Sequence, residues 1–173
     1  MSKPLSPLFH KTIGEKNHHY LKIPPNQATQ NLIHVVLWAN KLADELSKIS
    51  KRKRDKFNTA SVAYDESTGK YYYGRNKGIE INNTPKNSIL FGDSNHSGVL
   101  PQQSFNNYTI GNCSEVDAIN NALNDGAALK NLHLTTIHTT SGSLGKPKPA
   151  CENCTFSFKG KVKRNYTGWH KEN

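Results

Sequence analysis

Apolar residues recur at steps of three and four between positions 31 and 50, which is the period of a helix with one buried face. This stripe consists of Leu32, Val35, Val36, Ala39, Leu42, Ala43, Leu46 and Ile49. The pattern predicts a helix over residues 31–50, with Asn31 as its N-cap. Residues 1–30 lack the pattern and hold four of the eight prolines. We therefore expect an irregular N-terminal arm or linker remnant at 1–30 and one folded domain at 31–173.

Residues 57–76 change to a strand-forming pattern. Two runs rich in β-branched and aromatic residues flank a polar turn at 65–69, which predicts a β-hairpin. Side chains alternate along a strand, so we expect Tyr71 and Tyr73 on one face of the hairpin and Tyr72 on the other.

A second helix is predicted after a long polar segment. Residues 77–110 are weakly periodic, which predicts a loop with one short element near residues 88–91. Residues 112–124 again show helical spacing, with Asn112 as a possible cap and Gly126 as the stop. Its expected buried face is Val116, Ile119, Ala122 and Leu123.

The last part of the chain completes the order of elements. We expect a strand at 132–138, a loop at 139–150, a short helix or turn at 151–158 and a basic tail at 159–173. Helix, hairpin, long loop, helix, strand and helix in this order predict an α/β sandwich with a small mixed sheet.

The chain is strongly basic. Lys and Arg number 23 against 13 Asp and Glu, a formal charge of +10. This charge suggests nucleic acid or another anionic partner, or it serves solubility alone. The basic residues that we expect to contact phosphate are Lys51, Arg52, Lys53, Arg54, Lys163 and Arg164. For the run at 51–54, a solvated helix C-terminus is the alternative.

Hydropathy argues against a membrane segment. No apolar run approaches the roughly 20 residues that a membrane span needs. Residues 1–10 also lack the apolar stretch of a signal peptide. We expect no membrane contact and a monomeric protein.

The three cysteines are Cys113, Cys151 and Cys154. An odd number this small does not build a disulfide framework, and two of the three form a C-x-x-C pair. Each group falls at the start of a predicted helix, where the helix dipole favours the thiolate. Three thiolates form a zinc site with one position open for water. Glu115 shares the first helical turn with Cys113, and is placed to take a proton from that water and return it to a substrate.

These residues resemble the zinc deaminase superfamily, whose signature is H-x-E…P-C-x-x-C, with Cys replacing His in a three-Cys variant. The first half is Cys113-Ser114-Glu115, where the usual middle residue is Ala. The second half has an extra Ala150 between Pro149 and the first cysteine of the pair. The stretch 111–154, roughly a quarter of the chain, is similar to the YwqJ-like deaminases of bacterial polymorphic toxins.

The resemblance implies a cytidine deaminase-like three-layer α/β/α sandwich that binds Zn²⁺. It further implies an effector, secreted or delivered by bacteria, that acts in the target-cell cytoplasm and is inhibited by a cognate immunity protein. Two substrate contacts are carried over, Asn76 at the end of the hairpin and Ser114 beside Glu115. For Asn76, an ordinary turn residue is the alternative.

We therefore expect a hydrolytic deaminase that converts cytosine to uracil in DNA, with single strands favoured. RNA, a free nucleotide or adenine are the alternative substrates. A second interpretation is a non-catalytic zinc module with His133 or His138 as a fourth ligand, but such a module does not need Glu115. A third is a redox C-x-x-C protein, for which the strand context is missing.

Overall fold

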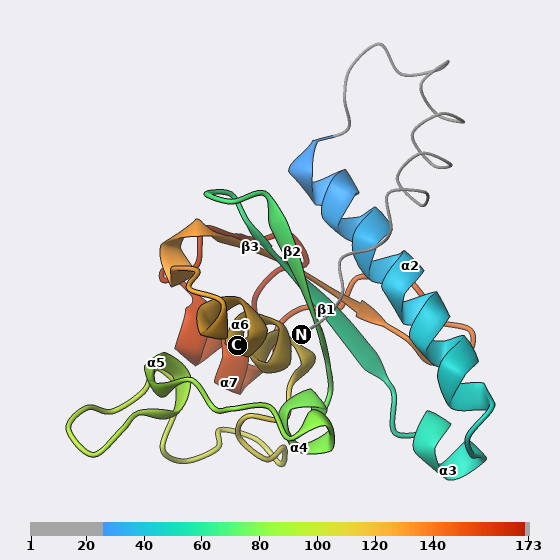
Figure 1. Cartoon of the computed structure of the whole chain (residues 1–173), viewed down its shortest axis with the longest axis horizontal. Coiled ribbons are helices and arrows are strands. Elements are labelled where there is room, and N and C mark those ends of the chain that lie inside the picture. Colours follow the sequence, from blue (N-terminus) through green and yellow to red (C-terminus); the bar gives the residue numbers. More distant parts are fainter. Residues whose placement is uncertain (1–25, 172–173) are drawn as a thin grey trace.

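A computed structural model describes residues 26–171, built around a four-stranded mixed sheet (Figure 1). The strands lie in the order β2-β1-β3-β4. Their bounds are β1 Thr59–Asp65, β2 Lys70–Arg75, β3 Leu132–His138 and β4 Arg164–Asn165. Strand β1 is antiparallel to both β2 and β3, whereas β4 is parallel to β3.

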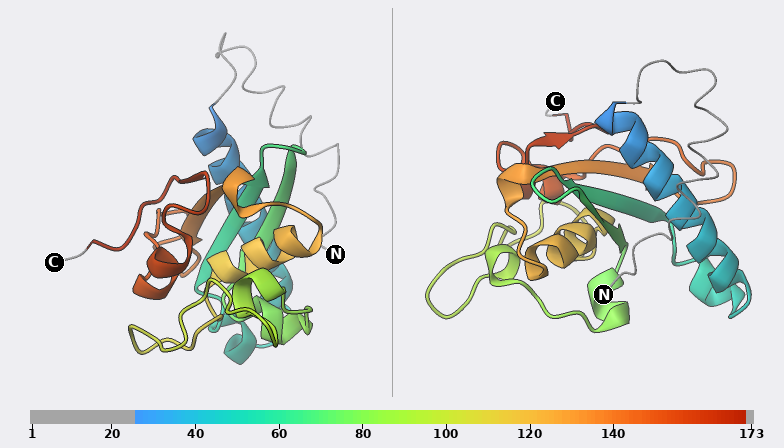
Figure 2. Two further views of the ribbon diagram at one scale, coloured as in Figure 1. Left: turned by 90° about the vertical axis from the view of Figure 1, so that its left-hand side faces the viewer. Right: turned by 45° about the horizontal axis from the view of Figure 1, so that its top comes forward.

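Helices cover both faces of the sheet (Figures 1 and 2). Helix α2, Gln27–Ser47, packs on one face and encloses a core that includes Val35, Val62 and Ile137. Helices α6, Ser114–Asn124, and α7, Glu152–Phe158, enclose a second core on the other face. The predicted α/β sandwich with a mixed sheet is confirmed. Among the described residues, no helix is long and apolar enough to cross a membrane.

Helix α2 begins earlier than the apolar stripe indicates. Its N-cap is Asn26, whose side-chain oxygen accepts a hydrogen bond from the Thr29 backbone N–H at 3.0 Å. The predicted cap at Asn31 is wrong, because Asn31 lies fully buried inside the helix and donates to the His133 carbonyl. The first turn is polar, so it carries no apolar period. Residues 27–30, which were predicted to belong to the irregular arm, are therefore part of α2. The rest of the predicted arm, residues 1–25, lies outside the described part of the chain.

The basic run forms a separate turn of helix. Helix α2 ends at Ser47, and α3, Lys51–Arg54, begins after Ser50, whose hydroxyl accepts from the Lys53 N–H. Leu32 and Ile49 were expected in the buried stripe but are 38% and 58% exposed. Ile49 lies beyond the end of α2, in the short link to α3, so it no longer follows the helical period.

The hairpin agrees with its pattern. Tyr73 packs in the α2 core with Tyr71 against it, whereas Tyr72 belongs to the α6 core, as the alternation predicts. The turn is held by Asp65, which accepts hydrogen bonds from the Ser67 backbone and from both the Ser67 and Thr68 hydroxyls.

The long segment after the hairpin contains two short helices. Helix α5, Ser88–Phe91, coincides with the predicted short element. Helix α4, Gly78–Asn82, was not predicted. It depends on a tertiary contact, because a Cβ at Gly78 would overlap the Asp117 carboxylate of α6, which also accepts from the Arg75 N–H at 2.9 Å.

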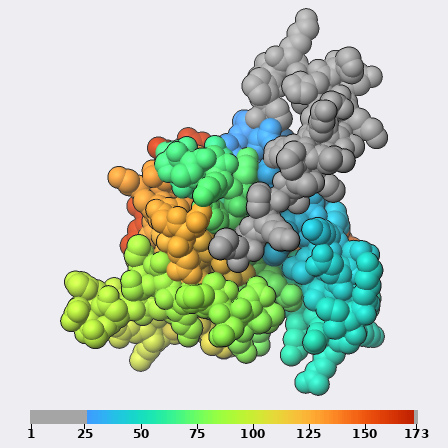
Figure 3. Space-filling model, in the orientation of Figure 1, coloured from blue at the N-terminus to red at the C-terminus, as the bar shows by residue number. Residues whose placement is uncertain are grey.

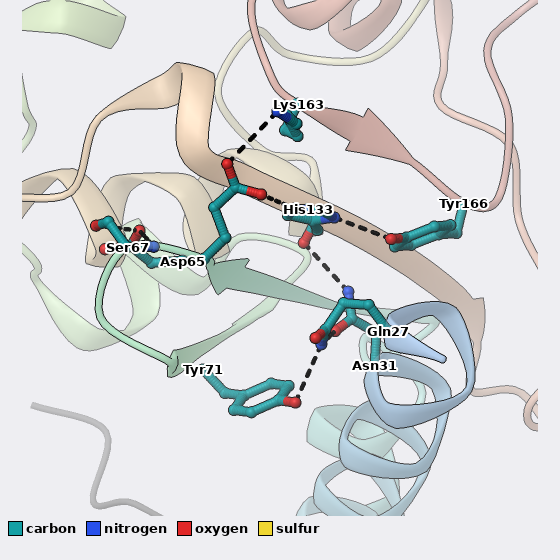
Figure 4. A network of polar contacts seen from close by, with 9 residues as sticks. Gln27, Asn31, Asp65, Ser67, Tyr71, His133, Lys163 and Tyr166 are labelled. Carbon is teal, nitrogen blue, oxygen red and sulfur yellow. Dashed lines mark hydrogen bonds and ion pairs between the residues drawn. The ribbon is translucent and has the colours of Figure 1, made fainter. Parts of the chain in front are cut away.

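A polar network joins the far edge of the sheet to the hairpin and α2 (Figure 4). The His133 ring bonds the Glu66 carboxylate at 2.8 Å and the Tyr166 hydroxyl at 2.9 Å. Lys163 forms an ion pair with Glu66 at 3.6 Å. These bonds anchor the predicted basic tail, which contains the two-residue strand β4. A 3₁₀ turn, Leu129–Asn131, precedes β3.

Helix α6 lies unusually close to strand β2. A Cβ at Gly74 would stand 2.2 Å from the Ala118 backbone nitrogen and 2.3 Å from the Ser114 carbonyl oxygen. Backbone atoms cannot yield as a flexible side chain does, so only glycine allows this approach. The contact sets the height of the first turn of α6 above the sheet.

We predict that Gly74→Ala destabilises the fold by about 3 kcal/mol, because the methyl group forces α6 off the sheet. Gly69→Ala is the matched control, since its Cβ meets nothing within 4 Å and only the positive φ opposes it. That control should cost about 1–2 kcal/mol. Urea unfolding measures both variants. Equal losses would contradict the close approach.

Candidate metal centre

Helix α6 begins directly after Cys113. This residue is extended, with φ −67° and ψ 147°, and its carbonyl accepts from the Val116 N–H at 3.1 Å. Asn112, the predicted cap, therefore lies one residue too early. The Cys113 side chain makes no capping bond to the helix, so its sulfur is available to neighbours. Glu115 and Asp117 occupy the first turn, where carboxylates suit the helix dipole.

Helix α7 starts in the same way after Cys151. That residue is also extended and uncapped through its side chain, and its carbonyl accepts from the Thr155 N–H at 2.8 Å. The preceding Ala150 is pinned by a backbone bond to the Gly168 carbonyl. One turn of helix then brings Cys154 to the same side as Cys151.

The three predicted ligands converge. The sulfur atoms of Cys113, Cys151 and Cys154 all lie within 4.8 Å of one another, and those of Cys113 and Cys151 are 3.4 Å apart. Three thiolates about 2.3 Å from a tetrahedral zinc ion stand about 3.8 Å apart, so the cluster fits this metal. All three are free thiols. Cys154 is buried and the other two are half-buried, so the cluster has one outward side.

The thiols share protons unequally. Hydrogen bonds from Cys113 and Cys154 lower the pKa of Cys151. The hydrogen bond to Cys151 is the largest cause that raises the pKa of Cys113. The pKa of Cys154 is raised mainly by its hydrogen bond with Cys113, and next by its bond with Cys151. The Glu115 charge raises both values further. Cys151 is therefore the thiolate that receives two donors, and a cation would replace those two protons.

Glu115 is buried beside the thiols. Its side chain is 3% exposed, and within the described residues its Oε1 atom has no hydrogen-bond partner. Oε2 accepts a weak bond from the Ser114 hydroxyl at 3.3 Å. Burial raises the pKa of Glu115, whereas the charge of Lys148 lowers it. A buried carboxylate oxygen without a partner is costly, so it marks a place for a bound donor.

Ser114 belongs to a buried chain of hydroxyl groups. Its oxygen is 2.7 Å from that of Ser61 on β1, which is 2.7 Å from that of Thr136 on β3. Ser114 has no exposed surface. The hydroxyl supports Glu115 and the sheet in this structure, and a contact between Ser114 and substrate stays a prediction.

Asn76 is held by backbone groups. Its carbonyl oxygen accepts from the Asn58 and Thr59 N–H groups at 3.1 and 3.3 Å, and its amide donates to the Lys56 carbonyl. These bonds give Asn76 the structural role that was the alternative interpretation. A substrate contact at Asn76 stays a prediction.

The basic residues form two separate groups. Those of α3 are all exposed at a protruding corner of the molecule (Figure 3). Lys163 and Arg164 lie beside the start of β3, which pairs with the end of β1. Strand β1 separates this group from α3, which precedes its start. The six residues do not form one continuous patch. Their contacts with phosphate stay predictions.

Two further residues bear on the site. His133 bonds Glu66 and Tyr166 through its two ring nitrogens, and in residues 26–171 the cysteine cluster includes no histidine. Sequence reasoning missed Lys148, whose positive charge acts on both Glu115 and Cys151. Its position three residues before Cys151 was the available signal, but only the fold shows that its charge acts on Glu115.

Comparisons with known proteins identified no relative of this chain. No family model, no curated protein and no solved structure matches this chain. The case for a function therefore depends on the site itself.

We predict about one zinc ion per chain in protein purified without chelators, and almost none in Cys154→Ala, because a thiolate ligand is lost. His138→Ala should keep its zinc, since the three cysteines need no histidine. Zinc affinity should fall as the pH falls, because protons compete for the thiolates. Elemental analysis of dialysed protein measures this. Loss of zinc in the His138 variant would contradict a three-cysteine site.

Proposed function

We propose that this chain is a zinc-dependent hydrolytic deaminase that acts on a nucleobase, with cytosine converted to uracil. The observation that carries the proposal is the buried Glu115 carboxylate, with one oxygen lacking a partner, beside three converging cysteines. A zinc site that only stabilises a fold has no use for a buried carboxylate, and normally takes four protein ligands. A deaminase needs both the open position and the carboxylate.

The residues divide the chemistry between them. Cys113, Cys151 and Cys154 would hold zinc, which when bound supplies a Lewis acid and makes hydroxide available near neutral pH. Glu115 takes the proton released from water, gives it to the ring nitrogen of the base, and then assists the departure of ammonia. Burial raises the pKa of Glu115, so the carboxyl group holds a proton more readily at neutral pH. Water and cytosine are thus converted to uracil and ammonia.

Two neighbours tune the carboxyl group. The Lys148 charge opposes the effect of burial and favours the ionised form that accepts the proton. The Ser114 hydroxyl donates to Oε2, which leaves Oε1 as the oxygen available for the transfer. The hydroxyl chain through Ser61 and Thr136 fixes the position of Ser114 above the sheet.

The resemblance to YwqJ-like deaminases supports the same function. Both halves of the motif stand at the starts of helices, and strand β3 lies between those helices in sequence. We propose on this resemblance that the chain is the toxin domain of a bacterial effector that acts in the target-cell cytoplasm, with a cognate immunity protein as its inhibitor.

The proposed substrate is a polynucleotide, with single-stranded DNA favoured. The charge of +10 and the exposed basic turn α3 suit a phosphate backbone better than a free nucleoside. A base within a duplex must be flipped out at a cost of a few kcal/mol, which an unpaired strand avoids.

We predict that Glu115→Gln lowers the rate of cytosine conversion about 100- to 10,000-fold, because the proton carrier is lost. Glu152→Gln is the matched control: it lies between the two cysteines but forms an ion pair with His170 at 3.3 Å. That variant should convert cytosine at the wild-type rate. The readout is uracil formed in a single-stranded DNA oligonucleotide by zinc-loaded protein.

The same assay tests the substrate class. Single-stranded RNA, duplex DNA and free deoxycytidine are offered in parallel, and conversion should be fastest in single-stranded DNA. No conversion of any of them by the wild type, with zinc bound, would refute the enzyme. Conversion that survives in Glu115→Gln would refute the role of this carboxylate.

A further inference from the structure

Two phenylalanine rings share an exposed surface on α7, the helix that begins after Cys151 and carries Cys154. Phe105 and Phe156 are each 55% exposed, and their ring centroids are 5.1 Å apart with the planes tilted by 50°. Single exposed apolar residues are ordinary on protein surfaces. A paired aromatic surface of this kind, contributed by segments 51 residues apart in sequence, is a more specific feature.

The pair is held in place by the helix that carries two of the cysteines. Asn153, which lies between Cys151 and Cys154, is buried, and its Oδ1 atom accepts from the Phe105 N–H at 2.9 Å. Its amide group donates to the Ser104 hydroxyl at 2.9 Å. The loop is thereby tied to the first turn of α7, at the end of the molecule where α5 and α6 also lie (Figure 1). Phe156 follows Cys154 by two residues.

The C-terminal part of the chain, which carries Phe156, is basic. Lys159 is exposed and follows Phe156 by three residues, as the C-cap residue of α7. Residues 145–173 contain seven Lys and Arg against two Glu. One of those two, Glu152, is already paired with His170. Aromatic rings with cations beside them are the combination that binds single-stranded nucleic acid, through base stacking and phosphate contacts.

We propose that Phe105 and Phe156 form a stacking platform for an unpaired base of a single-stranded polynucleotide. This inference rests on the proposed function, and it names a surface through which the protein holds that substrate. Asn153 is a positioning residue, because it fixes the loop that carries Phe105 to the helix that carries Phe156. Phenylalanine rings form no hydrogen bonds with base edges, so we expect the platform to bind any of the bases by stacking.

The test measures binding without catalysis. Zinc-loaded Glu115→Gln protein is titrated against a fluorescent oligothymidine, which contains no cytosine, and anisotropy gives the affinity. Phe105→Ala and Phe156→Ala, each made in this protein, should weaken binding about 5- to 100-fold, since a stacked base contributes about 1–3 kcal/mol. The corresponding Tyr variants should bind as the parent does, because the ring is kept. Affinity for duplex DNA should change little.

Leu144→Ala is the control, because Leu144 is 44% exposed but lies in a different loop. Unchanged zinc content and unfolding temperature show that each variant is folded. Unchanged oligothymidine affinity in both Ala variants would overturn the platform, and if they also alter sedimentation, the rings are a protein contact instead.

The two assays distinguish a failure of the proposed deaminase activity from a failure of the stacking platform. If the wild type converts no cytosine while the Ala variants lose oligothymidine affinity, the platform stands and the deaminase does not. If conversion is normal and the affinities are equal, the deaminase stands and the platform falls.

Discussion

The approach of helix α6 to strand β2 at Gly74 governs the geometry of the whole site. Because Gly74 has no side chain, the Ser114 carbonyl and the Ala118 nitrogen rest directly on the strand. The first turn of α6 is thereby fixed, with Cys113 before it and Glu115 in it. The hydroxyl chain through Ser61 and Thr136 continues the same contact across β1 and β3. Cys113 and Glu115 are thereby positioned by a helix that rests on the sheet.

The spacing of residues along the sequence was sufficient to predict the elements that depend on neighbouring residues alone. Helical periodicity located α6 to within two residues, and the predicted short helix or turn at 151–158 is α7. Alternation located the hairpin and assigned its tyrosines to the correct faces. The cysteine cluster was also predictable, because the C-x-x-C spacing and the place of each group at the start of a helix are typical of zinc ligands. Glu115 followed from its place in the same turn as Cys113.

Features that depend on tertiary contacts were not predictable. Helix α4 needs the Asp117 carboxylate against Gly78, and the early start of α2 depends on the cap at Asn26 rather than on apolar spacing. Nothing in the local pattern shows that Asn153 ties a distant loop to α7, or that Lys148 acts on Glu115. The two basic groups look like one patch in composition, but β1 separates them in the fold.

The most direct test of this account is the coordination of the metal, because the open position separates an enzyme from a stabilised module. X-ray absorption at the zinc edge of the purified protein should show three sulfur ligands at about 2.3 Å and one oxygen ligand at about 2.0 Å. That result supports Cys113, Cys151 and Cys154 with water in the fourth place. An imidazole or a fourth sulfur in that place would contradict the account, since a closed site leaves Glu115 no water to act on.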